Sequence, residues 1–223
     1  MFQNYPDSMN TPDELLQAYN ALFVFLGGSV SLEPEESGLS HFCETGLLRN
    51  LPIESRNLKF LEASQLLKSP CIHKQQCCKM VGDNYQSIFA AGRTSPAYPA
   101  ASNWFNTGTD TDEHNRMLEE VYRRYGYSRD AECSLEADHL GIELLFVNLL
   151  IEKYLTEDDY EIKEMIRKDL VKFITEELLT WVPRWAEKVS EKSVTKCYAG
   201  ISGLIIGGLE DVYDILRYQK LGL

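Results

Sequence analysis

The chain has 223 residues, of which 44% are hydrophobic and 25% are charged. This composition is that of a globular protein and excludes a disordered one, and the length suits one large domain or two small ones. The chain holds 22 basic and 34 acidic residues, a formal net charge of −12. Such a charge repels a phosphate backbone, so it argues against nucleic-acid binding and favours a basic partner.

No apolar stretch reaches the roughly 18 residues that a membrane-spanning helix needs. The first residues, MFQNYPDSMNTPDE, lack both the basic region and the apolar core of an export signal. We therefore expect a cytoplasmic protein without a membrane span.

The N-terminal portion shows the signals of several helices. Residues 11–14 (TPDE) combine a capping hydroxyl, a proline and two acids, which predicts a helix start, and Gly27-Gly28 predicts the end of that helix. We expect further helices at about residues 35–48, from near Glu54, and at residues 83–91, the last ended by Gly92.

Residues 93–110 read RTSPAYPAASNWFNTGTD and are a loop by composition. Tyr98, Trp104 and Phe105 are apolar enough to be buried, which argues against disorder. We expect an ordered linker that joins an N-terminal portion (11–92) to a C-terminal portion (111–221) within one domain spanning residues 1–223.

The C-terminal portion is also helical in pattern. A helix at 112–125 ends at Gly126, Ser134 is placed as the N-cap of the next helix, and residues 140–154 are apolar on nearly every face, as in a helix buried at the centre of a bundle. A further helix covers about 157–179, extends toward Trp181 and is broken or kinked at Pro183, and the last runs from near Trp185 to near Leu221. Because no alternating strand pattern appears, the fold prediction is an all-α bundle of roughly eight to ten helices.

Gly200, Gly203 and Gly207 fall on one face of the last helix. The sequence around Ser202 is close to a nucleophile elbow, but Leu204 stands where that motif needs its second glycine. The better interpretation is that the glycines let two helices approach closely.

Six cysteines are present, and without an export signal we expect them to be reduced. The spacing Cys71-x-His73-x3-Cys77-Cys78 allows a zinc interpretation, but no second ligand pair follows at a useful distance. We expect neither a metal nor a bound cofactor.

Asp138 and His139 form the most distinctive local pair. Neighbouring helical residues do not face each other, so the pair is a poor acid–base dyad, and the plain interpretation is that Asp138 stabilises a helix start beside a core histidine. Residues 132–177 hold 13 acidic and 5 basic residues by count, which predicts either a solvated helix face or a surface for a basic peptide. On the residues alone, a helical adaptor for a basic protein and a small metal-dependent hydrolase using His139 and Asp138 both stay open.

Three segments resemble motifs of one family. Residues 136–146 (EADHLGIELLF) resemble the E-P-x-D-H-x-x-x-E-L-x-F segment of the TorD/DmsD/NarJ-type chaperones of molybdoenzymes, also called redox enzyme maturation proteins. Residues 85–92 and 98–104 (YPAASNW) resemble the Y-x-x-L-F-x-G and P-P-Y-E-S-x-Y segments, and residues 173–183 resemble F-x-x-x-H-L-x-x-W-x-P. Leu135-Glu136 replaces the Glu-Pro pair, Ala100-Ala101 replaces Tyr-Glu, and Glu177 replaces the histidine, which suggests a divergent branch with a different client.

The resemblance implies a non-enzymatic chaperone without catalytic residues. It would bind the apo form of a molybdopterin-dependent oxidoreductase, through an N-terminal or twin-arginine leader segment, until the cofactor is inserted. In that scheme Asp138 pairs with a leader arginine, and His139 orients the peptide or anchors the loop. The implied peptide-binding residues are Asp138, His139, Ser102, Trp104, Tyr98 and Glu136. The resemblance also makes a homodimer formed by helix exchange conceivable, with its hinge at residues 93–110.

Overall fold

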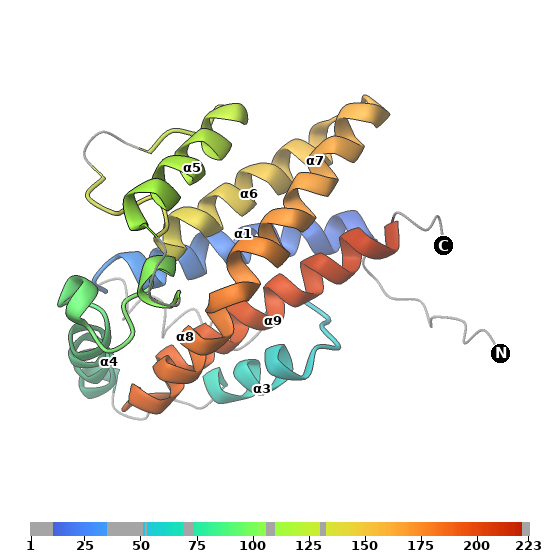
Figure 1. Ribbon diagram of the computed structural model, residues 1–223. Helices are drawn as coiled ribbons and strands as arrows, with labels where there is room; N and C mark the ends of the chain where they lie inside the picture. The colour runs from blue at the N-terminus through green and yellow to red at the C-terminus, as the bar shows by residue number, and fades with distance from the viewer. Residues whose placement is uncertain are drawn as a thin grey trace.

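The computed structural model describes residues 11–34, 51, 53–68, 74–105, 110–129 and 133–219. Within these ranges every regular element is helical, apart from an isolated bridge between Ala100 and His139, so the all-α prediction is confirmed (Figure 1). The elements are α1 (Pro12–Ser31), α3 (Leu58–Leu67), α4 (Lys74–Ile88), η2 (Gly92–Thr94), η3 (Ala101–Asn103), α5 (Thr111–Arg124), α6 (Leu140–Thr156), α7 (Tyr160–Lys172), η4 (Phe173–Leu178), α8 (Leu179–Lys192) and α9 (Lys196–Gln219). Because α7, η4 and α8 follow without a break, the described helices form seven separate rods, slightly fewer than expected. The helix expected at 35–48 lies outside the described residues.

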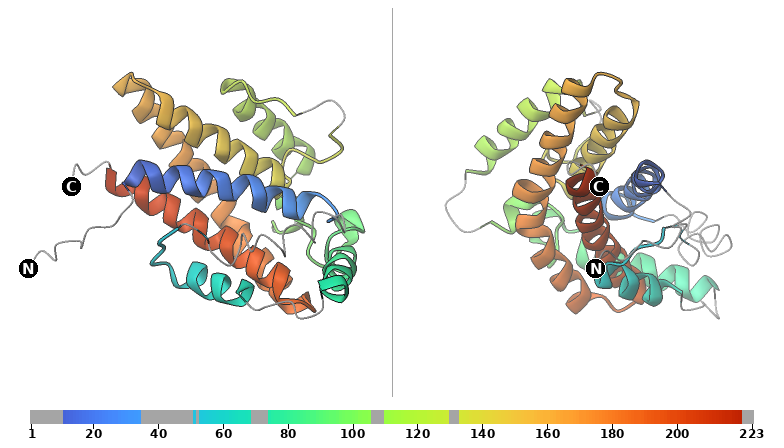
Figure 2. Two further views of the ribbon diagram at one scale, coloured as in Figure 1. Left: turned by 180° about the vertical axis from the view of Figure 1, so that it is seen from behind. Right: turned by 90° about the vertical axis from the view of Figure 1, so that its right-hand side faces the viewer.

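Helix α6 runs through the core of the bundle, as its composition predicts. Its buried side chains fall on several faces, and even the charged Glu143 is fully buried. Helix α1 packs between α6 and α9, and α9 in turn contacts α3 and α8 (Figure 2). The apolar faces of these helices meet in one continuous core.

Helix α1 starts as expected but does not end at Gly27-Gly28. Thr11 and Glu14 form a reciprocal capping box, whereas the helix continues to Ser31. The reason is tertiary, because Gly27 lies against α6, where an added Cβ would sit 3.3 Å from the carbonyl oxygen of Gly141. Gly27, which was expected to help end the helix, instead lets α1 and α6 pack closely. The core contacts of α1 stabilise the continued helix.

The glycine face of α9 allows the close approach that its spacing predicts. A Cβ added at Gly203 would lie 2.7 Å from the Cβ of Ala63, and one added at Gly207 would lie 2.6 Å from the backbone nitrogen of Phe60. Both neighbours belong to α3, which packs along α9. The small residues thus set the distance between these two helices.

Pro183 does not break the helix, since α8 continues through this residue to Lys192. Proline normally clashes with the carbonyl four residues earlier. Here that residue, Leu179, closes the π-helical η4 with ψ −5°, which turns its carbonyl away from the helical direction. The chain is interrupted later instead, at residues 193–195, before α9 begins at Lys196.

Residues 93–105 of the expected linker form turns and the short helices η2 and η3, while 106–109 lie outside the described residues. The expectation of reduced cysteines fails at Cys77, which is disulfide-bonded. Cys78, Cys133 and Cys197 form no disulfide bond. No helix among the described residues is long and apolar enough to cross a bilayer.

The α3–α9 contact yields a stability prediction. We expect Gly207→Ala to lower the free energy of unfolding by about 1–3 kcal/mol, because the new methyl group overpacks against the backbone of Phe60. Gly28→Ala is the matched control, since a Cβ at Gly28, in the last turn of α1, meets nothing within 4 Å; it should raise stability by about 0.5 kcal/mol. Urea denaturation measures both, and equal effects would contradict the packing explanation.

Candidate functional site

The loop at residues 93–105 is held against the turn that precedes α6 by backbone hydrogen bonds. The Leu140 amide donates to the carbonyl oxygen of Pro99 at 2.7 Å, and the Ala101 amide donates to that of Asp138 at 2.9 Å. These bonds satisfy backbone groups that would otherwise be buried without partners. The two segments therefore form one unit, although almost forty residues separate them in the chain.

The same bonds explain why α6 does not start at Ser134, as expected, but at Leu140 with His139 as its N-cap. Residues 137–139 form a turn instead of a first helical turn, because the loop takes up their backbone groups. The Nδ1 atom of His139 accepts a hydrogen bond from the Gly141 amide at 3.1 Å. The capping role that the sequence assigned to Ser134 thus belongs to His139.

Asp138 joins three elements. Its carboxylate accepts a hydrogen bond from the Ser102 amide at 2.9 Å, and its own amide donates to the side chain of Asn115 in α5 at 3.0 Å. Its side chain is completely buried. Asp138 therefore fixes the position of the loop relative to α5 and the start of α6.

His139 is only 2% exposed and lies edge-on to the ring of Tyr98, with 5.7 Å between the ring centroids. Burial lowers the pKa of His139 to about 4, although the charge of Asp138 acts in the opposite direction. The imidazole is accordingly neutral near pH 7, and because Nδ1 accepts a hydrogen bond, its proton resides on Nε2.

The other four expected site residues lie at the rim of the loop. Arg93, which the sequence analysis did not single out, donates from Nε to Glu136 at 2.8 Å and from Nη1 to the Ser102 hydroxyl at 2.6 Å. The indole of Trp104 donates to the carbonyl oxygen of Tyr98 at 2.9 Å. Residues Tyr98, Ser102, Trp104 and Glu136 are all partly exposed, unlike Asp138 and His139.

A cavity of about 420 Å³ opens beside this rim, and Arg93 and Glu136 line it together with residues of α5 and the 133–137 segment. One carboxylate oxygen of Glu136, Oε2, is buried and has no hydrogen-bond partner. Glu136 therefore binds the guanidinium group of Arg93 through Oε1, while its second oxygen is enclosed without a partner.

A cluster of ionisable side chains, His114, Glu143 and Glu177, lies between α5, α6 and η4. The sequence analysis did not predict it. His114 and Glu177 form an ion pair at 2.9 Å, and Glu143 is buried with neither oxygen hydrogen-bonded. Burial, followed by the charges of Glu177 and Asp138, raises the pKa of Glu143 well above its usual range. Burial also opposes the charged form of His114, but Glu177 and then Asp138 outweigh it and raise the pKa of His114.

The sequence analysis placed Glu143 within the 136–146 motif and Glu177 at the position of a motif histidine, but nothing in it brought these two residues together. Among the residues that the structure describes, no group of three or more His, Cys, Asp or Glu side chains is arranged to hold a metal ion. Of the residues weighed as zinc ligands, Cys71 and His73 lie outside those residues.

The family model of the nitrate reductase delta subunit matches residues 59–187, which is more than half of the chain and includes the loop, the turn and the cluster of ionisable side chains. The chain belongs to this family. The resemblance to TorD/DmsD/NarJ-type chaperones is thereby confirmed.

Several curated proteins are similar to the chain over part of its length. The chaperone protein TorD of Aliivibrio fischeri is 30% identical over 127 residues, which cover 55% of this chain and 58% of the relative. The chaperone protein TorD of Vibrio atlanticus is 30% identical over 114 residues, or 49% and 52% of the two chains. The chain thus spans about half the length of the curated relatives it matches. Their names are those of chaperones, a non-enzymatic class, which supports the prediction that this chain is not an enzyme.

The contacts of Asp138 predict a graded effect of substitution. Asp138→Ala leaves the half-buried Ser102 amide without an acceptor and should lower the free energy of unfolding by about 1–3 kcal/mol. Asp138→Asn keeps an acceptor oxygen and should cost less. Urea denaturation gives the two energies, and amide hydrogen exchange at Ser102 should accelerate in the Ala variant. Unchanged exchange would show that the side chain does not hold the loop.

The buried neutral His139 predicts a pH dependence. The unfolded imidazole takes up a proton below about pH 6.5, whereas the folded one does so only near pH 4. The folded state is therefore destabilised as pH falls through this window, by about 2 kcal/mol between pH 7 and pH 5. His139→Asn retains a capping acceptor and should lose this contribution.

The measurement is the free energy of unfolding of wild type minus that of His139→Asn at several pH values. The subtraction removes the opposing contribution of Glu143, whose raised pKa makes stability fall as pH rises. A difference that does not change with pH would contradict the assignment of a buried neutral imidazole.

Proposed function

We propose that this protein is a cytoplasmic, system-specific chaperone. In this proposal it binds the apo form of a molybdopterin-dependent oxidoreductase through an N-terminal or twin-arginine leader segment and assists cofactor insertion. The family match, together with relatives named as TorD chaperones, carries the proposal. The rim of the 93–105 loop supplies a binding surface of matching chemistry.

The Arg93–Glu136 pair indicates how a leader arginine would bind. Glu136 and the Ser102 hydroxyl already hold one guanidinium group, that of Arg93. A leader arginine would share or replace the contacts of Arg93, in a charge-assisted and geometrically specific pairing. The pair is partly exposed, so the exchange requires no movement of the core.

The neighbouring aromatic residues would contact the apolar part of the leader. Tyr98 and Trp104 are partly exposed and fixed to each other by the indole hydrogen bond. Rigid aromatic side chains bind apolar segments at a low entropy cost. Because Asp138 and His139 are buried, we assign them to positioning this surface: they anchor the loop, and the residues at its rim contact the client.

The expected homodimer by helix exchange also remains a proposal. The 93–105 loop joins α4 to the segment before α5 and is attached to the turn through a small set of hydrogen bonds. If these bonds opened, the loop could serve as the hinge of an exchange between two copies.

The decisive experiment is calorimetry with a synthetic twin-arginine leader peptide of the oxidoreductase recovered with this protein from the native cell. Glu136→Gln should weaken binding about tenfold, because a charge-assisted hydrogen bond becomes a neutral one. Trp104→Ala should weaken it through lost apolar contact. Glu62→Gln, which removes one exposed carboxylate on α3, is the matched control and should have no effect.

A peptide with Lys-Lys in place of Arg-Arg separates this function from that of an adaptor for basic proteins. The charge is the same, but lysine cannot reproduce the two-pronged guanidinium contact. Equal affinity for both peptides, together with full binding by Glu136→Gln, would favour the adaptor.

A further inference from the structure

The guanidinium group of Arg93 is bound by side chains of the loop and of the segment before α6. Its Nε atom donates to Glu136 at 2.8 Å. Its Nη1 atom donates to the hydroxyl group of Ser102 at 2.6 Å and to the side chain of Asn103 at 3.4 Å. A carboxylate and two neutral oxygens around one guanidinium group form a geometrically specific arginine site. The protein's own arginine fills that site.

The contact is open to solvent, and the backbone of Arg93 is fixed without it. The side chains of Arg93 and Glu136 are 38% and 36% exposed. The side-chain amide of Asn103 donates to the carbonyl oxygen of Arg93 at 2.9 Å. Backbone hydrogen bonds to the turn before α6 hold the rest of the loop. The guanidinium group can therefore leave its site while the loop stays in place.

The cavity of about 420 Å³ beside this site carries balanced charge. Among the residues that the structure describes, its charged lining consists of three basic and three acidic side chains: Arg93, Arg116, Arg129, Asp112, Glu119 and Glu136. Arg129 is itself held by Glu119 and by the carbonyl oxygen of Leu135. A basic peptide therefore meets no net negative charge here while Arg93 is in place, and it meets an excess of carboxylate once that side chain has left.

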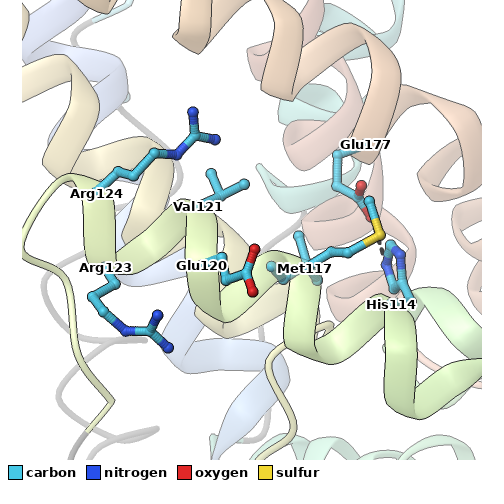
Figure 3. A pocket seen from close by; sticks show the side chains of 8 residues that line it. His114, Met117, Glu120, Val121, Arg123, Arg124 and Glu177 are labelled. Atoms are coloured by element: carbon cyan, nitrogen blue, oxygen red, sulfur yellow. Dashed lines mark ion pairs between the residues drawn. The ribbon is translucent and has the colours of Figure 1, made fainter.

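The other exposed side of α5 lacks an arginine held in this way. It faces η4 across a groove of about 730 Å³, in which the one ion pair between described residues joins His114 and Glu177 (Figure 3). Arg123 and Arg124 also line this groove, and their side chains point to different sides of the helix (Figure 3). The guanidinium site with its own occupant is therefore a feature of the rim cavity.

Aromatic side chains lie next to the guanidinium site. Burial, and then the charge of Glu136, raises the pKa of Tyr98, whereas the charge of Arg93 acts in the opposite direction. Both charged groups are thus close to the Tyr98 hydroxyl group. The indole of Trp104 donates to the carbonyl oxygen of the same tyrosine. A peptide whose arginine reaches Glu136 therefore places its neighbouring residues within reach of these two rings.

We propose that Arg93 is an internal competitor for the leader arginine and that this competition sets the specificity of the site. The identity of the ligand rests on the proposed function. A leader arginine that displaces Arg93 exchanges one guanidinium contact for another at the same acceptors, so this exchange contributes little net free energy. Binding is then driven by the apolar stretch of the leader against Tyr98 and Trp104. A basic peptide without that stretch does not displace Arg93, although the protein has a net charge of −12.

The test uses calorimetry with two peptides: the synthetic leader peptide, and a shortened form that keeps Arg-Arg and its polar neighbours but lacks the apolar stretch. Arg93→Ala empties the guanidinium site, and Arg93→Ala/Glu136→Gln also removes its carboxylate. Arg116→Ala is the matched control, because it removes the same charge from the same cavity, while the hydrogen bond that it breaks lies within α5. Circular dichroism melting checks that all variants fold.

We expect Arg93→Ala to bind the shortened peptide at least about tenfold more tightly than wild type and Arg116→Ala do. The reason is that an occupant which fills a site about nine-tenths of the time lowers the apparent affinity of that site about tenfold. The double variant should lose this gain. Equal binding of the shortened peptide by Arg93→Ala and Arg116→Ala, or a gain that survives in the double variant, would overturn the proposal.

A small probe separates the failure of this proposal from that of the proposed function. Ethylguanidinium, titrated into isotope-labelled protein, should shift the amide signals of Ser102 and Asn103 in Arg93→Ala and much less in wild type, whereas ethylammonium should shift neither. If ethylguanidinium binds in this way but neither peptide binds any variant, the leader-binding function fails and the exchangeable occupancy of the site by Arg93 stands. If the leader peptide binds wild type but ethylguanidinium shifts neither protein, the leader-binding function stands and the internal competitor fails.

Discussion

The hydrogen bonds between residues 99–102 and 138–140 are the constraint on which the candidate site depends. Each side offers backbone groups that its own segment cannot satisfy, and each satisfies those of the other. This exchange decides where α6 begins, places His139 as its cap and holds the aromatic loop over the bundle. The loop and the turn are therefore joined mainly through their backbones. The buried side chains of Asp138 and His139 add to this attachment.

The sequence predicted the fold well wherever local signals and core packing agree. The capping box at Thr11, the buried α6 segment and the glycine face of α9 were all recognised, since each is a pattern within one helix. Predictions failed where another segment overrides the local signal. Gly27 packs against Gly141 of α6, so α1 does not end there, and the loop binds the turn before α6, so this helix does not start at Ser134. The π-helical segment changes the backbone before Pro183, so the helix is not broken at the proline. None of these partners is visible within a short window of sequence.

Most residues of the candidate site were named from the sequence, but their positions and the contacts of Arg93 were not. Motif resemblance brought Tyr98, Ser102, Trp104 and Glu136 together with Asp138 and His139, and the structure places all six at one junction. Sequence could not show which of them are buried. It also assigned the acids of residues 132–177 to the surface as one group, whereas Asp138 and Glu143 are inside and Glu177 is paired with His114. The carboxyl groups that lie inside leave fewer on the surface to attract a partner.

The π-helical segment at Phe173–Leu178 has a consequence for how this family should be aligned. One additional residue per turn rotates everything that follows by about 100° relative to an uninterrupted α-helix. As a result, Asp169, before the π-helical segment, accepts a hydrogen bond from Tyr125 of α5. Trp185, after the segment, donates to the carbonyl oxygen of Ala97 in the loop. A homologue that lacks this turn would need a one-residue gap here; without that gap, its inward-facing positions would be compared with solvent-facing ones along the whole of α8.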